Sequence, residues 1–193
     1  EMCIRDREYF MNELRPIQII LLGFFITIFA GSILLTLPIA AKSGQATSYI
    51  DALFTATTSV CVTGLVVETT MTHWSLFGQV VILLLVQIGG LGVVTITTGM
   101  FYVLGRRITL GNRMLIQESL GLNTLTGLVP LVKKIILGTA IVEGAGAVLY
   151  ATQFIPEFGV GYGIWAAVFN SISAFCNAGM DIVKAVSYTH LRA

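Results

Sequence analysis

Residues 49–65 read YIDALFTATTSVCVTGL, an apolar stretch rich in hydroxyl side chains. Its helical part, 49–60, is too short to cross a bilayer, because a hydrocarbon core of ~30 Å needs roughly 20 helical residues. Ser48 and Asp51 match a capping box at its start, so the sequence predicts a half-helix that enters the membrane and stops there. The turn that follows, VCVTGL (60–65), would place non-helical backbone at membrane depth, which is tolerated only inside protein or along a watery cavity.

Longer apolar runs flank this half-helix and are predicted to cross the membrane. The first is IQIILLGFFITIFAGSILLTL (17–37), bounded by Pro16 and Pro38, and the second covers 74–104. Proline suits the first turn of a helix and ends a helix when it follows one. The second run is longer than a span requires, so we expect tilt or a bend there. Its glycines, in QIGGLG (87–92), favour close helix packing, with a hinge as the alternative.

The same plan recurs further along the chain. The sequence predicts a span over 129–155, a loop over 156–163 and a second half-helix over 164–175, followed by CNAGMDIV (176–183). A shift of 115 residues superposes the two short segments. Each copy follows a span of the same predicted direction, so the repeats are expected to be parallel. The identical pairs are Ala52 and Ala167, Phe54 and Phe169, Cys61 and Cys176, and Gly64 and Gly179.

The composition of the whole chain agrees with a membrane protein. Hydrophobic residues make up 55% of it and charged residues 11%, and the mean hydropathy is +0.87. Soluble domains carry about 25% charged residues, so lipid must cover part of this surface. No basic stripe indicates a nucleic-acid partner, and the cysteines lack metal-ligand spacing. The fold class predicted is an all-α polytopic membrane protein made of span–pore-loop–span repeats.

The two ends of the chain differ from the sequence between them. EMCIRDR (1–7) and VSYTHLRA (186–193) resemble translated linker sequence, so we expect them to be non-native. The polar stretch 105–128 has helical apolar spacing, which is typical of an amphipathic segment at a membrane surface. We divide the chain into a cytoplasmic lead with a non-native start (1–13), a first repeat (14–104), a cytoplasmic linker (105–128), a second repeat truncated after its turn (129–184) and a non-native tail (185–193).

Basic residues set the orientation expected in the membrane. Eight of them precede the first span or accompany the 105–128 linker, against two on the opposite side. The positive-inside bias therefore puts the N-terminus and the linker in the cytoplasm, and both half-helices enter from outside. The eight are Arg5, Arg7, Arg15, Arg106, Arg107, Arg113, Lys133 and Lys134, and the two are Lys42 and Lys184.

The turns after the half-helices have the features of a cation pathway. Each contains a glycine, which reaches φ > 0 without a steric clash. Carbonyl oxygens there could replace the hydration shell of a cation, and the C-terminus of each half-helix adds roughly −0.5 charge. The sequence thus favours selectivity by backbone coordination and predicts no enzyme activity.

Other functions are weighed against this one. A solute carrier with broken helices would need polar side chains at a midplane site, where backbone loops dominate here. A membrane protein that only binds partners would have no reason to repeat a half-helix and a glycine turn. His73 lies beside Ser75, but the chain has no G-x-S-x-G elbow and no acid to orient the histidine, which disfavours a hydrolase.

Four motifs together resemble the Trk/Ktr/HKT superfamily of potassium transporters. They are TATTSVCVTGL (55–65), QIGGLG (87–92), ITLGNRMLIQESL (108–120) and ISAFCNAGMDI (172–182). The linker is most similar to the Ktr membrane subunit of Gram-positive bacteria. The resemblance implies potassium uptake across a bacterial inner membrane by four potassium-channel-like units around one pore. About one and a half units are present, so this chain alone is not expected to conduct.

The same resemblance implies the site residues and the partners. Members with serine in place of the first filter glycine favour sodium, so Gly64 implies potassium selectivity. K⁺ is then the transported ion and Na⁺ a candidate coupling ion, without a bound cofactor. The implied partners are a second copy of the full-length subunit, a cytoplasmic nucleotide-binding regulatory subunit of the RCK/KTN type and the lipid bilayer. The filter residues are Val62, Thr63, Gly64, Asn177, Ala178 and Gly179.

Five further side chains are considered beside the filter residues. Glu68 and Asp181 follow the filter glycines, where they would concentrate cations at a pore mouth or serve as ordinary loop charges. Cys61 and Cys176 are expected to be small apolar fillers behind the turns. Glu143 lies inside a predicted span, where a charge is costly and often functional. The alternatives are that it pairs with a neighbouring span, joins a polar cluster or is protonated, and we do not assign it to the ion path.

Overall fold

The computed structural model describes residues 16–92, 95 and 128–183. This part of the chain is helical, and its only β-type pairing is an isolated bridge between Ala41 and Trp74. The predicted linker therefore lies outside the described residues, apart from its last position. The elements are α2 (Pro16–Thr36), the 3₁₀ turn η1 (Pro38–Ala40), α3 (Tyr49–Val60), α4 (Thr70–His73), α5 (Leu76–Leu91), α8 (Leu128–Phe158) and α9 (Val160–Phe175).

Two of these helices are long and apolar enough to cross a membrane. They are Gln18–Thr36 in α2, with 19 residues, and Pro130–Phe158 in α8, with 29 residues. Only 17% and 6% of their apolar windows are buried by the rest of the described chain. Apolar surface of this extent needs a cover of lipid or further protein, as the composition predicts.

The first half-helix has the predicted bounds, and its expected cap is only partly formed. Ser48 is the residue before α3, but its side chain makes no capping hydrogen bond. Its main-chain carbonyl instead accepts from the N–H of Ala52 at 2.9 Å. The capping-box prediction was therefore right about where the helix starts and wrong about the side-chain contact.

The loop predicted over 156–163 is wrong. Helix α8 continues to Phe158, and α9 begins at Val160, so Gly159 alone joins them with a φ of +81°. A Cβ on Gly163 would lie 2.8 Å from the Cα of Ile155, so the two helices touch directly after the corner. Glycine permits both the left-handed backbone and this close approach, and no longer connection is needed.

Helix α5 is shorter than the run from which it was predicted. It ends at Leu91, and Gly92 follows with a φ of +84° and open space where a side chain would be. Beyond Gly92 only Thr95 is described, so the remainder of the predicted span is outside the described residues. The hinge alternative therefore fits Gly92, where the helix ends. Close helix packing fits Gly89 and Gly90, whose contacts are given below.

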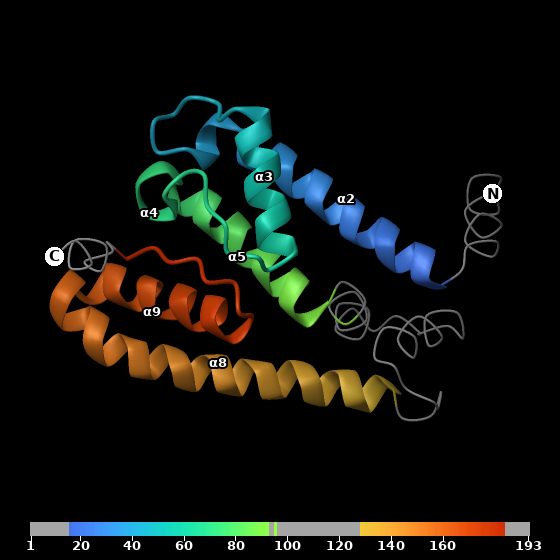
Figure 1. Ribbon diagram of the computed structural model, residues 1–193. Helices are drawn as coiled ribbons and strands as arrows, with labels where there is room; N and C mark the ends of the chain where they lie inside the picture. Colours follow the sequence, from blue (N-terminus) through green and yellow to red (C-terminus); the bar gives the residue numbers. More distant parts are fainter. Residues whose placement is uncertain (1–15, 93–94, 96–127, 184–193) are drawn as a thin grey trace, which may run out of the picture.

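The helices form two similar pairs held together by α5. In Figure 1, α3 returns alongside α2, α9 returns alongside α8, and α5 lies between the two pairs. Trp74, Ile82 and Phe169 are fully buried in the core that joins them. The chain leaves both half-helices in the middle of the molecule, where their turns meet.

Candidate functional site

The first turn begins where α3 ends. The N–H of Cys61 donates to the carbonyl of Thr57 at 2.8 Å, and the N–H of Thr63 donates to the carbonyl of Thr58 at 3.0 Å. Two residues then have left-handed backbone, Val62 with a φ of +54° and Gly64 with a φ of +76°. These bonds close the end of the helix and reverse the direction of the chain.

The second turn repeats this geometry at the predicted offset. Cys176 donates to Ile172 at 2.9 Å, and Ala178 donates to Ser173 at 2.7 Å. The left-handed residues are Asn177, with a φ of +60°, and Gly179, with a φ of +66°. The two turns therefore share a backbone path that the sequence repeat alone could not establish.

One hydroxyl group stabilises each turn, accepting a backbone hydrogen bond in the first turn and donating one in the second. In the first, Thr58 Oγ1 accepts from the N–H of Leu65 at 3.0 Å and lies 2.5 Å from Thr63 Oγ1. In the second, Ser173 Oγ donates to the carbonyl of Met180 at 2.5 Å. Equivalent positions thus hold the turn through an N–H in one copy and through a carbonyl in the other.

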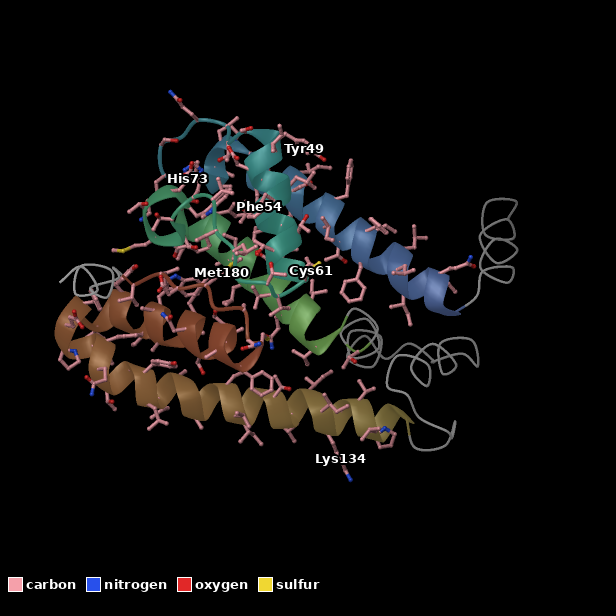
Figure 2. The ribbon with its side chains drawn as sticks, viewed as in Figure 1. Tyr49, Phe54, Cys61, His73, Lys134 and Met180 are labelled. Carbon is pink, nitrogen blue, oxygen red and sulfur yellow. The ribbon has the colours of Figure 1, made fainter. Side chains whose placement is uncertain are left out.

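The two turns touch each other. A Cβ on Gly64 would clash with the carbonyl oxygen of Ala178 and would lie 3.7 Å from the Cα of Gly179. Ser59, one turn earlier on α3, lies 3.8 Å from the sulfur of Met180, and Figure 2 shows Cys61 and Met180 near the same centre. The carbonyl of Ala178 therefore points toward the first turn, and the two turning points face one region.

The glycines of α5 form a seat beneath both turns. A Cβ on Gly89 would clash with the carbonyl of Val60, the last residue of α3. A Cβ on Gly90 would lie 2.5 Å from the sulfur of Cys176, which ends α9. Adjacent glycines on one helix thus support adjacent half-helix ends. The sequence marked this motif for packing but not its partners.

The six predicted filter residues lie together, with different exposure. Thr63, Asn177 and Gly179 are exposed, Val62 and Gly64 are half-buried, and Ala178 is buried. The filler prediction holds for Cys176, which is buried, and is wrong for Cys61, which is exposed. The described chain covers the cysteine only in the second copy, because Gly90 lies beneath Cys176 whereas Gly89 meets the backbone of Val60.

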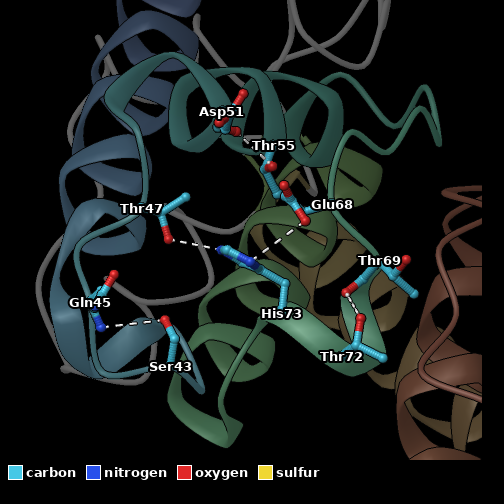
Figure 3. A network of polar contacts seen from close by, with 9 residues as sticks. All are labelled: Ser43, Gln45, Thr47, Asp51, Thr55, Glu68, Thr69, Thr72 and His73. Atoms are coloured by element: carbon cyan, nitrogen blue, oxygen red, sulfur yellow. Dashed lines mark hydrogen bonds and ion pairs between the residues drawn. The ribbon is translucent and has the colours of Figure 1, made fainter.

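Glu68 faces the loop between α2 and α3 (Figure 3). Its carboxylate lies 3.6 Å from Nδ1 of His73, and Nε2 of that histidine lies 2.9 Å from the hydroxyl of Thr47. Figure 3 shows Thr47, His73 and Glu68 in one row. Ser75 instead caps α5, donating to the carbonyl of Ile39 at 2.6 Å and accepting from the N–H of Gly78. The expectation that no acid orients His73 is therefore wrong, because Glu68 lies against its ring. The hydrolase alternative still gains no support, because the hydroxyl of Ser75 bonds to the backbone and not to His73.

Asp181 follows the second turn and has a different environment. Much of the residue is exposed, yet partial burial of its carboxyl raises the pKa of Asp181 above the ordinary value. It therefore loses its charge at a less acidic pH than a free aspartate. Nearby, the hydroxyl of Tyr162 donates to the carbonyl of Ile182. Among the described residues no group of three His, Cys, Asp or Glu side chains could hold a metal ion.

Comparisons with known proteins agree on one family. The family model described as TrkH, cation transport protein, matches residues 5–188. The chain is 44% identical over 172 residues to the potassium/sodium uptake protein NtpJ of Enterococcus hirae, covering 89% of this chain and 38% of that protein. It is 42% identical over 167 residues to the Ktr system potassium uptake protein B of Bacillus subtilis, covering 86% and 37%. The chain thus spans less than two fifths of these curated relatives.

Proposed function

The chain belongs to the TrkH family of cation transport proteins, and from that premise we propose that it forms the first two units of a potassium-uptake subunit. The observation that carries the proposal is the contact between the two turns. Turns with one backbone path meet where Gly64 faces the carbonyl of Ala178. Turns that meet bring the peptide oxygens of two units to one region, as a cation site lined by carbonyls requires.

In the proposed mechanism, main-chain oxygens replace the water around K⁺. They would come from residues 62–64 and 177–179, completed by two further units of the same kind. Helices α3 and α9 end at these turns, and the C-terminus of each contributes roughly −0.5 charge, which favours a cation. No covalent step is involved.

The wider assembly is part of the same proposal. The two apolar helices and the family support a membrane location, for which we propose a bacterial inner membrane with the N-terminus inside. Two relatives are named as proteins of a Ktr system. By that analogy the complete subunit would pair with a second copy and with a cytoplasmic nucleotide-binding regulatory subunit, with Na⁺ as a candidate coupling ion.

Uptake by a complete subunit that carries this sequence tests the proposal. Expressed in a bacterial strain without its own potassium uptake, the subunit should restore growth at low K⁺ and accumulate K⁺ in preference to Na⁺. The variant Gly64→Ser should lower that preference, because a side chain displaces the turn from the Ala178 carbonyl. An unchanged ratio of K⁺ to Na⁺ uptake in this variant would reject the filter role of Gly64.

A further inference from the structure

A polar link lies beneath the second turn. Nε2 of Gln87, on α5, donates to Oε2 of Glu143, on α8, at 3.1 Å. Oε1 of the same amide accepts from the sulfur of Cys176 at 3.6 Å. Cys176 ends α9 and directly precedes Asn177. The link thus joins two helices to the residue from which the turn starts. At the offset of the repeat, the position of Glu143 is occupied in the first copy by apolar Ile28.

The link is enclosed by its surroundings. Glu143 and Cys176 each expose 9% of their surface, and the hydroxyl of Ser171 donates to the main-chain carbonyl of Glu143 at 2.6 Å. Oε1 of Glu143 has no hydrogen-bond partner within the described part of the chain. Ionisable side chains inside a spanning helix are costly and usually functional, so we expect the Glu143 carboxylate to have a function.

The chemistry of a carboxylate orients the amide. The NH₂ group of Gln87 faces Glu143, whose carboxyl oxygen accepts its hydrogen bond. The carbonyl oxygen of the amide is then directed at Cys176. A hydrogen bond to sulfur is weak, but here Gly90 also approaches the same sulfur from α5. The carbonyl oxygen of Gln87 and the close approach of Gly90 therefore fix the position of the Cys176 thiol.

We propose that Glu143 is a positioning residue for the second turn. By orienting Gln87 it fixes Cys176, and with it the register of residues 177–179 against the first turn. This inference rests on the proposed function, because register matters only if the turns share a cation. The competing role is a polar bridge that joins α5 to α8, which would contribute stability and leave the turn unchanged.

The reactivity of Cys176 tests the link without any transport measurement. In the complete subunit in its membrane, with all other cysteines replaced, a small water-soluble methanethiosulfonate reagent should modify Cys176 slowly. Glu143→Leu should raise this rate about tenfold, because the loss of one hydrogen bond worth about 1.4 kcal/mol changes an equilibrium tenfold. Glu143→Gln keeps an acceptor in place but removes the negative charge near the thiol, so its rate should lie between those of the unchanged protein and Glu143→Leu. An unchanged rate in Glu143→Leu, or equal rates in the two variants, would overturn the proposal.

Ion affinity provides the second measurement. Glu143→Leu should raise the K⁺ concentration at half-maximal uptake about tenfold, with little change in the maximal rate, and Glu143→Gln should restore it. If neither the unchanged subunit nor any variant takes up K⁺ while the thiol results hold, the proposed function fails and only the link from Glu143 to Cys176 stands.

Gln79 supplies the matched control on the same helix. Its amide is 3% exposed and accepts from the indole N–H of Trp165 at 2.8 Å, joining α5 to α9 away from the turns. Gln79→Leu should lower the temperature of unfolding but leave both Cys176 reactivity and half-maximal K⁺ unchanged. If it changes both as much as Glu143→Leu does, the effect is general packing and the positioning role is wrong.

Discussion

The two turns have the same backbone conformation, but their residues differ in how readily they adopt it. At the first left-handed position the first turn has Val62 and the second has Asn177. Asparagine tolerates this conformation, whereas a β-branched residue there is an outlier. The first turn is therefore held in its shape by its surroundings, and the second also by local preference. Backbone strain of this kind persists only where the surrounding structure determines the conformation.

The glycines differ in the same sense. Gly64 has both a positive φ and the carbonyl of Ala178 in the space of a side chain, whereas Gly179 has a positive φ and nothing within 4 Å of that space. The first turn is thus fitted against the second, while the outer side of Gly179 is open among the described residues. The comparison shows that equal backbones need not tolerate equal substitutions.

Replacing Gly64 and Gly179 with alanine should give the largest difference in stability between the two turns. Left-handed backbone costs a non-glycine residue roughly 1–2 kcal/mol, and crowding costs about 1–3 kcal/mol more. Gly64→Ala incurs both penalties, and Gly179→Ala only the first. Thermal unfolding of the complete subunit in detergent should show the larger loss for Gly64→Ala. Equal losses would mean that the contact between Gly64 and Ala178 is absent.

Replacing Gly89 and Gly90, the glycines of α5 that lie beneath the turns, with alanine should give the next largest difference in stability. A Cβ on Gly89 meets the backbone of Val60, which cannot rotate away, so a loss of about 2 kcal/mol is expected. A Cβ on Gly90 meets the side chain of Cys176 and not its main chain at closest approach, so this clash should cost less. Both substitutions also gain about 1 kcal/mol in helix propensity, which leaves their order unchanged. The same unfolding assay checks the order, and a greater loss for Gly90→Ala would contradict the described seat.

Exchanging the left-handed residues should have the smallest effect, of opposite sign in the two turns. Val62→Asn relieves strain and should stabilise the subunit by about 1 kcal/mol or less, whereas Asn177→Val should destabilise it by a similar amount. Shifts in the midpoint of thermal unfolding measure both. If Asn177→Val is neutral, local preference does not distinguish the turns.

The sequence was most informative where local rules decide the structure. The bounds of α3 and the end of α9 follow from apolar length and from the glycine turn after each helix, and the offset of the repeat paired Val62 with Asn177. The loop predicted over 156–163 was wrong, because α8 continues through Pro156 to Phe158 and α9 begins at Val160. In the structure Gly163 instead serves close packing against Ile155, which only the tertiary arrangement reveals.

The partners within the site were less predictable. Cys61 and Cys176 occupy equivalent positions in similar segments, yet one is exposed and the other buried. Which face of α5 meets which turn decides this difference, and a single sequence does not specify that choice. Pairing with a neighbouring span was one of the roles predicted for Glu143, but the sequence could not name Gln87 as the partner.

The one-residue corner at Gly159 also bears on the order of folding. Twelve residues, 37–48, separate α2 from α3, whereas α8 and α9 have almost no connection to close, and the entropy lost in closing a connection grows with its length. The α8–α9 hairpin can thus assemble from contacts between chain neighbours as soon as both helices leave the ribosome. Protein made with that hairpin alone should already protect its amides from hydrogen exchange.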